Sequence, residues 1–139
     1  FYVVQKVAEA LNGREKSLRD SKILVLGAAF KKDVNDARNS PAIRVMELLL
    51  KDGARLDYND PYVPEVTVGK GIFSRRSHDV QLQSVDLDDA AVRAADCVVI
   101  TVAHSAYDVD WILERAQLVV DTVNATKRAT AHHEKVVLI

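Results

Sequence analysis

The sequence has a single cysteine, Cys97, which excludes an internal disulfide and fits a reducing compartment. It has no apolar run close to the roughly 20 residues that a membrane-spanning helix requires, and no stretch with the pattern of a signal peptide. It also lacks an excess of charge of either sign. The net charge of −1 gives no reason to expect nucleic acid or an anionic membrane as a partner. We therefore expect a cytoplasmic protein that binds neither.

The 139 residues, 48% hydrophobic and 28% charged, suffice for one domain with its own core. The chain starts at Phe1, without an initiator methionine, inside an apolar pattern of helical spacing that runs to Leu11. A natural chain rarely begins in mid-helix. We expect residues 1–15 to be the end of a longer helix and residues 20–139 to form the domain.

Short apolar runs alternate with helical patterns along the rest of the chain. Runs such as ILVL (23–26) and CVVITV (97–102) are apolar throughout, as in parallel strands that are buried on both faces. The alternation predicts an α/β fold: a Rossmann-like, doubly wound, mainly parallel sheet with helices on both faces. The expected strands are 23–26, 54–60, 81–85, 97–102, 118–121 and 135–139, and the expected helices are 41–52, 86–96 and 111–115.

Two helix starts are marked by capping residues. Ser40 is a favourable N-cap, and Pro41 suits the first helical position because its missing N–H would have no partner there. Asp86 is expected to cap the next helix, with Asp88 and Asp89 near the positive end of the helix dipole. The loop after the first strand therefore leads directly into a capped helix.

This loop, GAAFKKDVNDARNS (27–40), carries three cations: Lys31, Lys32 and Arg38. In an open α/β sheet, ligands bind beyond the carboxyl ends of the strands, where this loop lies. The N-terminus of the following helix offers N–H groups and a partial positive charge, which suit a phosphate. We expect an anion site here, with Phe30 against a ring or a sugar face.

The same loop is unsuited to a dinucleotide. The fingerprint G-x-G-x-x-G would need three glycines, whereas the loop has only Gly27, and Ala28-Ala29 would crowd a pyrophosphate that approached the backbone. A second interpretation of the cations is that they are solvated loop charges, partly paired with Asp33 and Asp36. Position and charge leave both interpretations open.

A series of motifs extends beyond this loop. In chain order, the motifs are GAAFK (27–31), DVNDARNSP (33–41), LDYNDPYVP (56–64), TVAHSAYD (101–108) and VVDTVNA (119–125). Over residues 20–126 these motifs resemble the C-terminal, UDP-binding domain of the UDP-glucose/GDP-mannose dehydrogenase family. Among its branches, LDYNDPYVP looks most like the UDP-N-acetylhexosamine 6-dehydrogenases, such as UDP-N-acetylglucosamine 6-dehydrogenase.

The resemblance implies a parent protein of polysaccharide biosynthesis that oxidises the C6 hydroxyl of a UDP-sugar to a carboxylate. Two NAD⁺ and a thioester on a catalytic cysteine serve that reaction in the family. The family's cysteine motif, G-G-x-C-[FL]-P-K-D, does not occur here, so we expect this chain to bind without catalysing. We interpret Cys97 as a core residue. The resemblance also places the main NAD site outside this chain and implies a homodimer or higher oligomer centred on the first helix.

Carried over by position, Phe30 and Lys31 match residues that contact the UDP-sugar, and Arg38 matches an arginine that reaches NAD. Two positions depart from the family. Asn39 stands where a glutamate is usual, and Val123 stands where many members have an arginine that helps to hold the substrate. Candidates to replace that arginine are Arg75, Arg76 and Lys127. Without a dehydrogenase parent, the loop would instead fit a non-catalytic Rossmann-like module that senses another nucleotide or coenzyme.

Four further positions carry chemistry-bearing side chains. His104 follows a strand and faces the same crevice, and without an evident acidic partner we interpret it as a lining residue rather than an acid–base group. Asp60 stands where a ribose-binding acid would stand, but we interpret it as a turn residue before a proline. His132-His133 would point apart on a strand, which argues against a shared metal. Trp111 is expected in the core.

Overall fold

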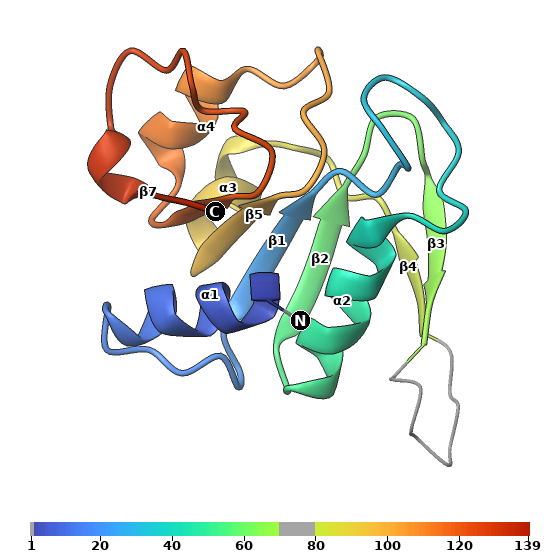
Figure 1. The fold of residues 1–139 in the computed structure, drawn as a ribbon, viewed down its shortest axis with the longest axis horizontal. Coiled ribbons are helices and arrows are strands. Elements are labelled where there is room, and N and C mark those ends of the chain that lie inside the picture. Colours follow the sequence, from blue (N-terminus) through green and yellow to red (C-terminus); the bar gives the residue numbers. More distant parts are fainter. Residues whose placement is uncertain (1, 70–79) are drawn as a thin grey trace.

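The computed structural model describes residues 2–69 and 80–139, which form a five-stranded parallel sheet and a separate two-stranded antiparallel sheet (Figure 1). Helices lie on both faces of the larger sheet, so the predicted Rossmann-like α/β class is confirmed. The elements are α1 (Tyr2–Asn12), β1 (Lys22–Leu26), α2 (Pro41–Lys51), β2 (Arg55–Asn59), β3 (Glu65–Val68), β4 (Val80–Gln83), α3 (Asp89–Ala94), β5 (Cys97–Ile100), α4 (Val109–Arg115), β6 (Val119–Asp121), the 3-10 helix η1 (His133–Lys135) and β7 (Val136–Leu138).

The parallel strands follow the order β2-β1-β5-β6-β7. The chain thus builds the sheet outward from β1 in one direction and from β5 in the other, which makes the gap between β1 and β5 the topological switch point. Strand register places Leu26, Asn59, Ile100 and Asp121 in one row across the sheet. The loops that follow these residues therefore leave the sheet side by side, at its carboxyl edge.

The strands are buried on both faces, as their unbroken apolar runs predict. In β1, Ile23 and Val25 join the core under α1 and α2, whereas Leu24 and Leu26 join the core under α3 and α4. The alternation follows from the pleat of a strand, which points successive side chains to opposite faces. Both layers therefore hold β1 rigidly, together with the start of the loop that follows it.

Helix α1 matches the apolar stripe of the sequence, with Val4, Val7 and Leu11 buried. It packs in the same core as α2, and its continuation into a longer helix stays a prediction. Among the described residues, no helix is long and apolar enough to cross a bilayer.

The predicted start of the next helix at Asp86 is wrong. Helix α3 begins at Asp89, and its N-cap is Asp88, whose carboxylate accepts a hydrogen bond from the Ala91 N–H at 2.8 Å. An N-cap side chain reaches N–H groups only two or three residues ahead. Asp86 stands too early in the chain to make this bond.

The region between β2 and α3 contains the second sheet, in which Val66 of β3 pairs with Leu82 of β4. Strand β4 matches the short strand expected near 81–85, whereas β3 was not predicted. Val66 is buried and joins the core beneath α2. The candidate cations Arg75 and Arg76 lie outside the described residues.

Candidate functional site

The loops after β1 and β5 touch at their first residues. Gly27 has a φ of 102°, in the left-handed region that favours glycine, and donates its N–H to the Asn59 carbonyl at 2.9 Å. A Cβ at this position would lie 2.5 Å from the Cβ of Val102. The Thr101 hydroxyl donates to the Gly27 carbonyl at 2.5 Å. The backbones of the two loops are thus held in direct contact at the switch point.

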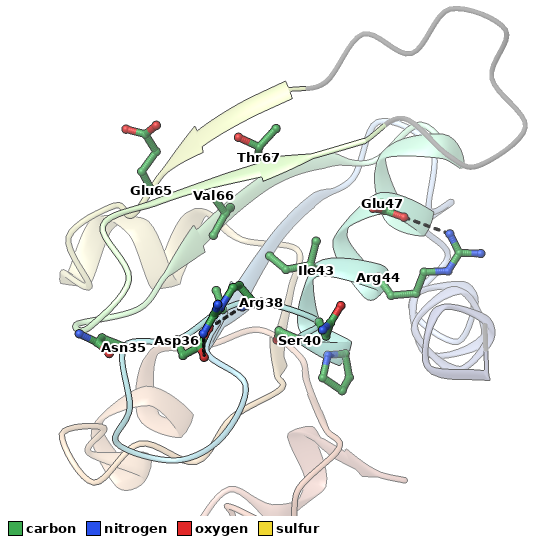
Figure 2. A pocket seen from close by; sticks show the side chains of 13 residues that line it. Asn35, Asp36, Arg38, Ser40, Ile43, Arg44, Glu47, Glu65, Val66 and Thr67 are labelled. Atoms are coloured by element: carbon green, nitrogen blue, oxygen red, sulfur yellow. Dashed lines mark hydrogen bonds and ion pairs between the residues drawn. The ribbon is translucent and has the colours of Figure 1, made fainter.

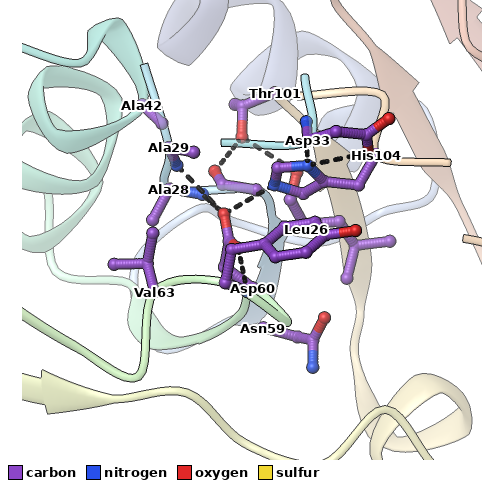
Figure 3. A network of polar contacts seen from close by, with 12 residues as sticks. Leu26, Ala28, Ala29, Asp33, Ala42, Asn59, Asp60, Val63, Thr101 and His104 are labelled. Carbon is purple, nitrogen blue, oxygen red and sulfur yellow. Dashed lines mark hydrogen bonds and ion pairs between the residues drawn. The ribbon is translucent and has the colours of Figure 1, made fainter. Parts of the chain in front are cut away.

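Asp60, the first residue after β2, is only 2% exposed and sits at the centre of a polar network (Figure 3). Its Oδ2 accepts hydrogen bonds from the Ala28 N–H at 2.8 Å and the Ala29 N–H at 3.0 Å. Its Oδ1 accepts from the Tyr62 N–H at 2.8 Å. The turn role predicted for Asp60 is confirmed, because its carbonyl also accepts from the Val63 N–H.

This arrangement corrects the expectation of free backbone donors for a phosphate. The Ala28 and Ala29 amides point at the carboxylate of Asp60. In the first turn of α2, the Ala42 N–H donates to the Ser40 hydroxyl at 3.2 Å and the Ile43 N–H to the Ser40 carbonyl at 3.1 Å. The protein's own oxygens therefore take the places that a phosphate would take in a dinucleotide fold. A ligand anion here would therefore not meet free N–H groups at Ala28, Ala29, Ala42 or Ile43.

His104, in the loop after β5, joins two of the other loops. Its Nε2 lies 2.8 Å from Asp60 Oδ2, and its Nδ1 accepts the Asp33 N–H at 2.9 Å. Nδ1 is therefore the acceptor of the ring, which leaves Nε2 as the donor to Asp60. The rings of Tyr62 and Tyr107 pack edge-on against it, at centroid distances of 5.0 and 5.6 Å.

The expectation that His104 lacks an acidic partner is therefore wrong, because Asp60 is that partner from 44 residues away. The side chains of both residues are 0% exposed. A general acid or base must reach the proton that it transfers. A fully buried imidazole between two rings instead fits a structural role, so His104 lies beneath the surface rather than lining an open crevice as expected.

Asp33, in the loop after β1, is bound to the loop after β5. Its φ of 59° lies in the left-handed region, which is uncommon for a residue with a Cβ. Its carboxylate accepts the Ser105 hydroxyl at 2.6 Å and the Ser105 N–H at 2.8 Å. These hydrogen bonds, that of the hydroxyl first, lower the pKa of Asp33. Asp33 thus pairs with Ser105 rather than with the neighbouring lysines.

Between the two fixed points lie Phe30, Lys31 and Lys32, all of them exposed. Phe30 is 54% exposed, and its N–H donates to the Asp36 carbonyl at 2.6 Å. Within the residues that the structure describes, the Lys31 ammonium has no hydrogen-bond or ion-pair partner. The structure thus presents an aromatic ring and an unpaired cation on a short span. Buried hydrogen bonds of Ala28 and Ala29 hold its amino end, and a partly buried hydrogen bond of Asp33 holds its carboxyl end. We call residues 30–32 the exposed span.

Arg38 lies further along this loop, beside an open groove of about 790 Å³ (Figure 2). Its guanidinium donates to both carboxylate oxygens of Asp36 at 3.2 Å, although its side chain is 88% exposed. This pairing lowers the pKa of Asp36. One of the expected pairs of a loop acid with a loop cation is therefore present. The groove is bounded by segment 35–41, the first turns of α2 and part of β3.

The remaining candidates lie elsewhere. Val123 is 41% exposed in the loop after β6, where Lys127 is exposed as well. Cys97 is fully buried, and this burial raises the pKa of its thiol to about 12, which fits the predicted core residue. Trp111 is only half-buried, with Arg115 stacked over its ring at 4.4 Å.

His132 and His133 do not lie on a strand as expected. They stand at the start of η1, and His132 has a left-handed φ of 66°. His133 is exposed, and its Nε2 lies 2.8 Å from the Ala129 carbonyl. Among the described residues, no cluster of histidine, cysteine and carboxylate side chains could hold a metal ion.

Comparison with known proteins identifies the domain. The family model for the UDP-binding domain of the UDP-glucose/GDP-mannose dehydrogenase family matches residues 24–128. UDP-glucose 6-dehydrogenase 2 of Arabidopsis thaliana is 43% identical over 70 residues, which are 48% of this chain and 15% of that protein. UDP-N-acetyl-D-mannosamine dehydrogenase of Methanococcus maripaludis is 28% identical over 131 residues, which are 88% of this chain and 27% of that protein.

Solved structures of dehydrogenases lead to the same assignment as the family match. An NDP-N-acetyl-D-galactosaminuronic acid dehydrogenase of Methanosarcina mazei Go1 has a TM-score of 0.72 at 26% identity, over 99% of this chain and 28% of that one. A UDP-D-ManNAc dehydrogenase of Pyrococcus horikoshii, at 22% identity and a TM-score of 0.73, shows the same fold over 99% of this chain and 30% of its own. The chain thus spans less than a third of these proteins. From the family match over most of its length, the chain belongs to the UDP-glucose/GDP-mannose dehydrogenase family and corresponds to its UDP-binding domain.

Proposed function

We propose that this chain is the UDP-sugar-binding part of a cytoplasmic, NAD-dependent dehydrogenase that oxidises the C6 hydroxyl of a UDP-sugar to a carboxylate. The support is the match of residues 24–128 to the family's UDP-binding domain. The catalytic cysteine and the main NAD site of such an enzyme belong to parts of the protein outside this chain. The chain supplies binding, and the active form is a homodimer or a larger oligomer.

The proposed binding site is the exposed span, residues 30–32. Phe30 lies against the sugar or the base, and Lys31 binds the diphosphate as a point charge. The observation behind this assignment is that Lys31 is an exposed cation without a partner among the described residues, on a loop held at both ends. Because the backbone amides at 28 and 29 serve Asp60, they are not available to the diphosphate, and the Lys31 side chain supplies the positive charge.

Arg38 is the proposed contact to NAD. The β1 loop does not fit a dinucleotide itself, since its first amides are taken by Asp60 and it lacks the glycine fingerprint. The exposed guanidinium of Arg38 fits a peripheral contact better. There it would exchange Asp36 for an anionic group, with the planar bidentate geometry that arginine offers.

For the sugar, we propose a UDP-N-acetylhexosamine, as in polysaccharide precursor synthesis. The relative aligned over 88% of this chain acts on UDP-N-acetyl-D-mannosamine. The more identical UDP-glucose 6-dehydrogenases align over a shorter stretch, 48% of this chain for the Arabidopsis protein. Side-by-side titration with UDP-N-acetylglucosamine, UDP-N-acetylmannosamine and UDP-glucose would rank the three.

The Lys31→Ala variant tests the binding site. Removing the ammonium should weaken UDP-sugar binding by about 10- to 100-fold, as expected for one charge-assisted hydrogen bond. Isothermal titration calorimetry on the full-length protein measures the change. Lys22→Ala is the matched control, because Lys22 is exposed at the first position of β1, at the opposite end of that strand from the loop (Figure 1). Equal affinities of Lys31→Ala and the wild type would remove Lys31 from the site.

A further inference from the structure

We propose that His104 is a positioning residue for UDP-sugar binding, which holds the exposed span in place without touching the ligand. This inference rests on the proposed function. Its basis is the convergence of three loops, those after β1, β2 and β5, on a single buried imidazole at the switch point (Figure 3).

The first step is the way in which the span is anchored. On the amino side of Phe30, the Ala28 and Ala29 N–H groups donate to Asp60 Oδ2. On the carboxyl side of Lys32, the Asp33 N–H donates to His104 Nδ1 at 2.9 Å. The two anchors are themselves joined, because His104 Nε2 lies 2.8 Å from the same Asp60 oxygen. One side chain therefore closes a ring of contacts around the span.

The second step concerns the backbone conformation of Asp33, which the contacts with His104 and Ser105 stabilise. Asp33 has a left-handed φ of 59°, which is disfavoured for a residue with a Cβ and persists where surrounding contacts fix it. His104 holds the Asp33 N–H, and the residue next to it, Ser105, holds the Asp33 carboxylate. Without these contacts the backbone at Asp33 would relax, and Lys31, two residues earlier, would change direction.

The third step is burial. The side chains of His104 and Asp60 are 0% exposed, and the rings of Tyr62 and Tyr107 cover the imidazole. Water cannot easily replace the hydrogen bond between His104 and Asp60, which is buried, whereas the bond from the Asp33 N–H to His104 Nδ1 is partly buried. A ligand on Lys31 also gains from a span that is already fixed, because less conformational entropy is lost on binding.

The His104→Gln substitution separates the two hydrogen bonds of the imidazole. In His104→Gln the amide nitrogen lies near the position of Nε2 and can still donate to Asp60, but the acceptor for the Asp33 N–H is lost. We expect UDP binding by the full-length protein to weaken about 3- to 10-fold, with an unchanged circular dichroism spectrum. Amide hydrogen exchange at residues 30–33 should speed up. His133→Gln, at an exposed histidine, is the matched control and should bind UDP as the wild type does.

A double-mutant cycle distinguishes positioning from a general loss of structure. In a background with Phe30→Ala and Lys31→Ala, His104→Gln should cost less than about twofold in UDP affinity, because the side chains that it positions are gone. An equal loss in both backgrounds overturns the inference, as does unchanged affinity in His104→Gln alone. If His104→Gln does not fold, Ser105→Ala takes its place in the cycle with the same expected pattern, because it removes only the hydroxyl bond to Asp33.

The two proposals fail in different ways. If the wild type does not bind UDP, or if Lys31→Ala binds as tightly as the wild type, the proposed site is wrong and the inference falls with it. If Lys31→Ala weakens binding while a folded His104→Gln does not, the site stands and only the positioning role of His104 is wrong.

Discussion

Asp60 shows at the scale of one residue how this sheet differs from a dinucleotide-binding one. In the latter, amides at the end of the first strand meet a pyrophosphate. Here the same amides, at Ala28 and Ala29, meet a carboxylate from the neighbouring strand end. The negative charge that the local backbone favours is therefore built into the chain. In the proposed function, the cation that meets the ligand is Lys31, further out on the loop.

The stability of the domain should depend on this carboxylate. Asp60→Ala leaves the Ala28 and Ala29 N–H groups without their buried acceptor, so we expect the free energy of unfolding to fall by roughly 3–5 kcal/mol. Urea unfolding measures it. Asp57→Asn, at an exposed position of β2, is the control and should change the value by less than about 0.5 kcal/mol. A loss below about 1 kcal/mol for Asp60→Ala would contradict the buried network.

The sequence indicated the residues of the candidate site better than their contacts. Phe30, Lys31 and Arg38 could be singled out because charge and motif are local properties. The His104–Asp60 pair could not, since it joins residues 44 positions apart. Finding it requires the register that sets Asn59, Leu26 and Ile100 in one row, and register is a property of the folded sheet.

At the scale of elements, α2 is the best-specified helix. Ser40 caps it, Pro41 occupies its first position, and Ser40 is 4% exposed. The Ser40 hydroxyl also donates to the Ala29 carbonyl at 3.1 Å. One side chain thus ends the β1 loop and starts the helix.

Ser40→Ala should therefore cost more than an ordinary cap. We expect the free energy of unfolding to fall by about 2 kcal/mol, the upper end for an N-cap, because the Ala29 carbonyl also loses its partner. Asp88→Ala, which removes an exposed cap of α3 with one bond, should cost about 1 kcal/mol. Thermal and urea unfolding of both variants give the comparison. The reverse order would show that the bond to Ala29 contributes nothing.

Other elements were less predictable for physical reasons. The four residues of β3 alternate too briefly to separate a strand from a polar loop. Three aspartates lie within four positions at the start of α3, so each is a plausible cap by residue type. The choice of Asp88 depends on which carboxylate reaches the Ala91 N–H. Strands β1 and β5, in contrast, are almost wholly apolar. Their sequences therefore predict a strand buried on both faces, whichever register the sheet adopts.

At the scale of the whole molecule, acid should loosen several parts at once. Hydrogen bonds lower the pKa of four aspartates in different places, with the Ser105 hydroxyl, Arg38, Arg93 and Lys16 as the leading donors for Asp33, Asp36, Asp89 and Asp96, respectively. A carboxyl group with a lowered folded pKa adds stability above its unfolded pKa and loses it as the pH falls through the folded value.

These four carboxyl groups should therefore make the free energy of unfolding fall as the pH drops from about 5 to below about 4. Urea unfolding across this range measures it. Asp96→Asn should flatten the acid limb, because Asp96 binds Lys16 and the Lys22 N–H, whereas Asp57→Asn should leave it as it is. Stability that rises on acidification would contradict this assignment of the four groups.

The close approach at Gly27 has a consequence for laboratory evolution of this domain. A side chain there would collide with the backbone and Cβ of Val102. Most variants in a library randomised at codon 27 should therefore misfold. Diversity placed at codons 30 to 32 alters exposed side chains while the contact of the two loops stays intact. New recognition properties should be sought there.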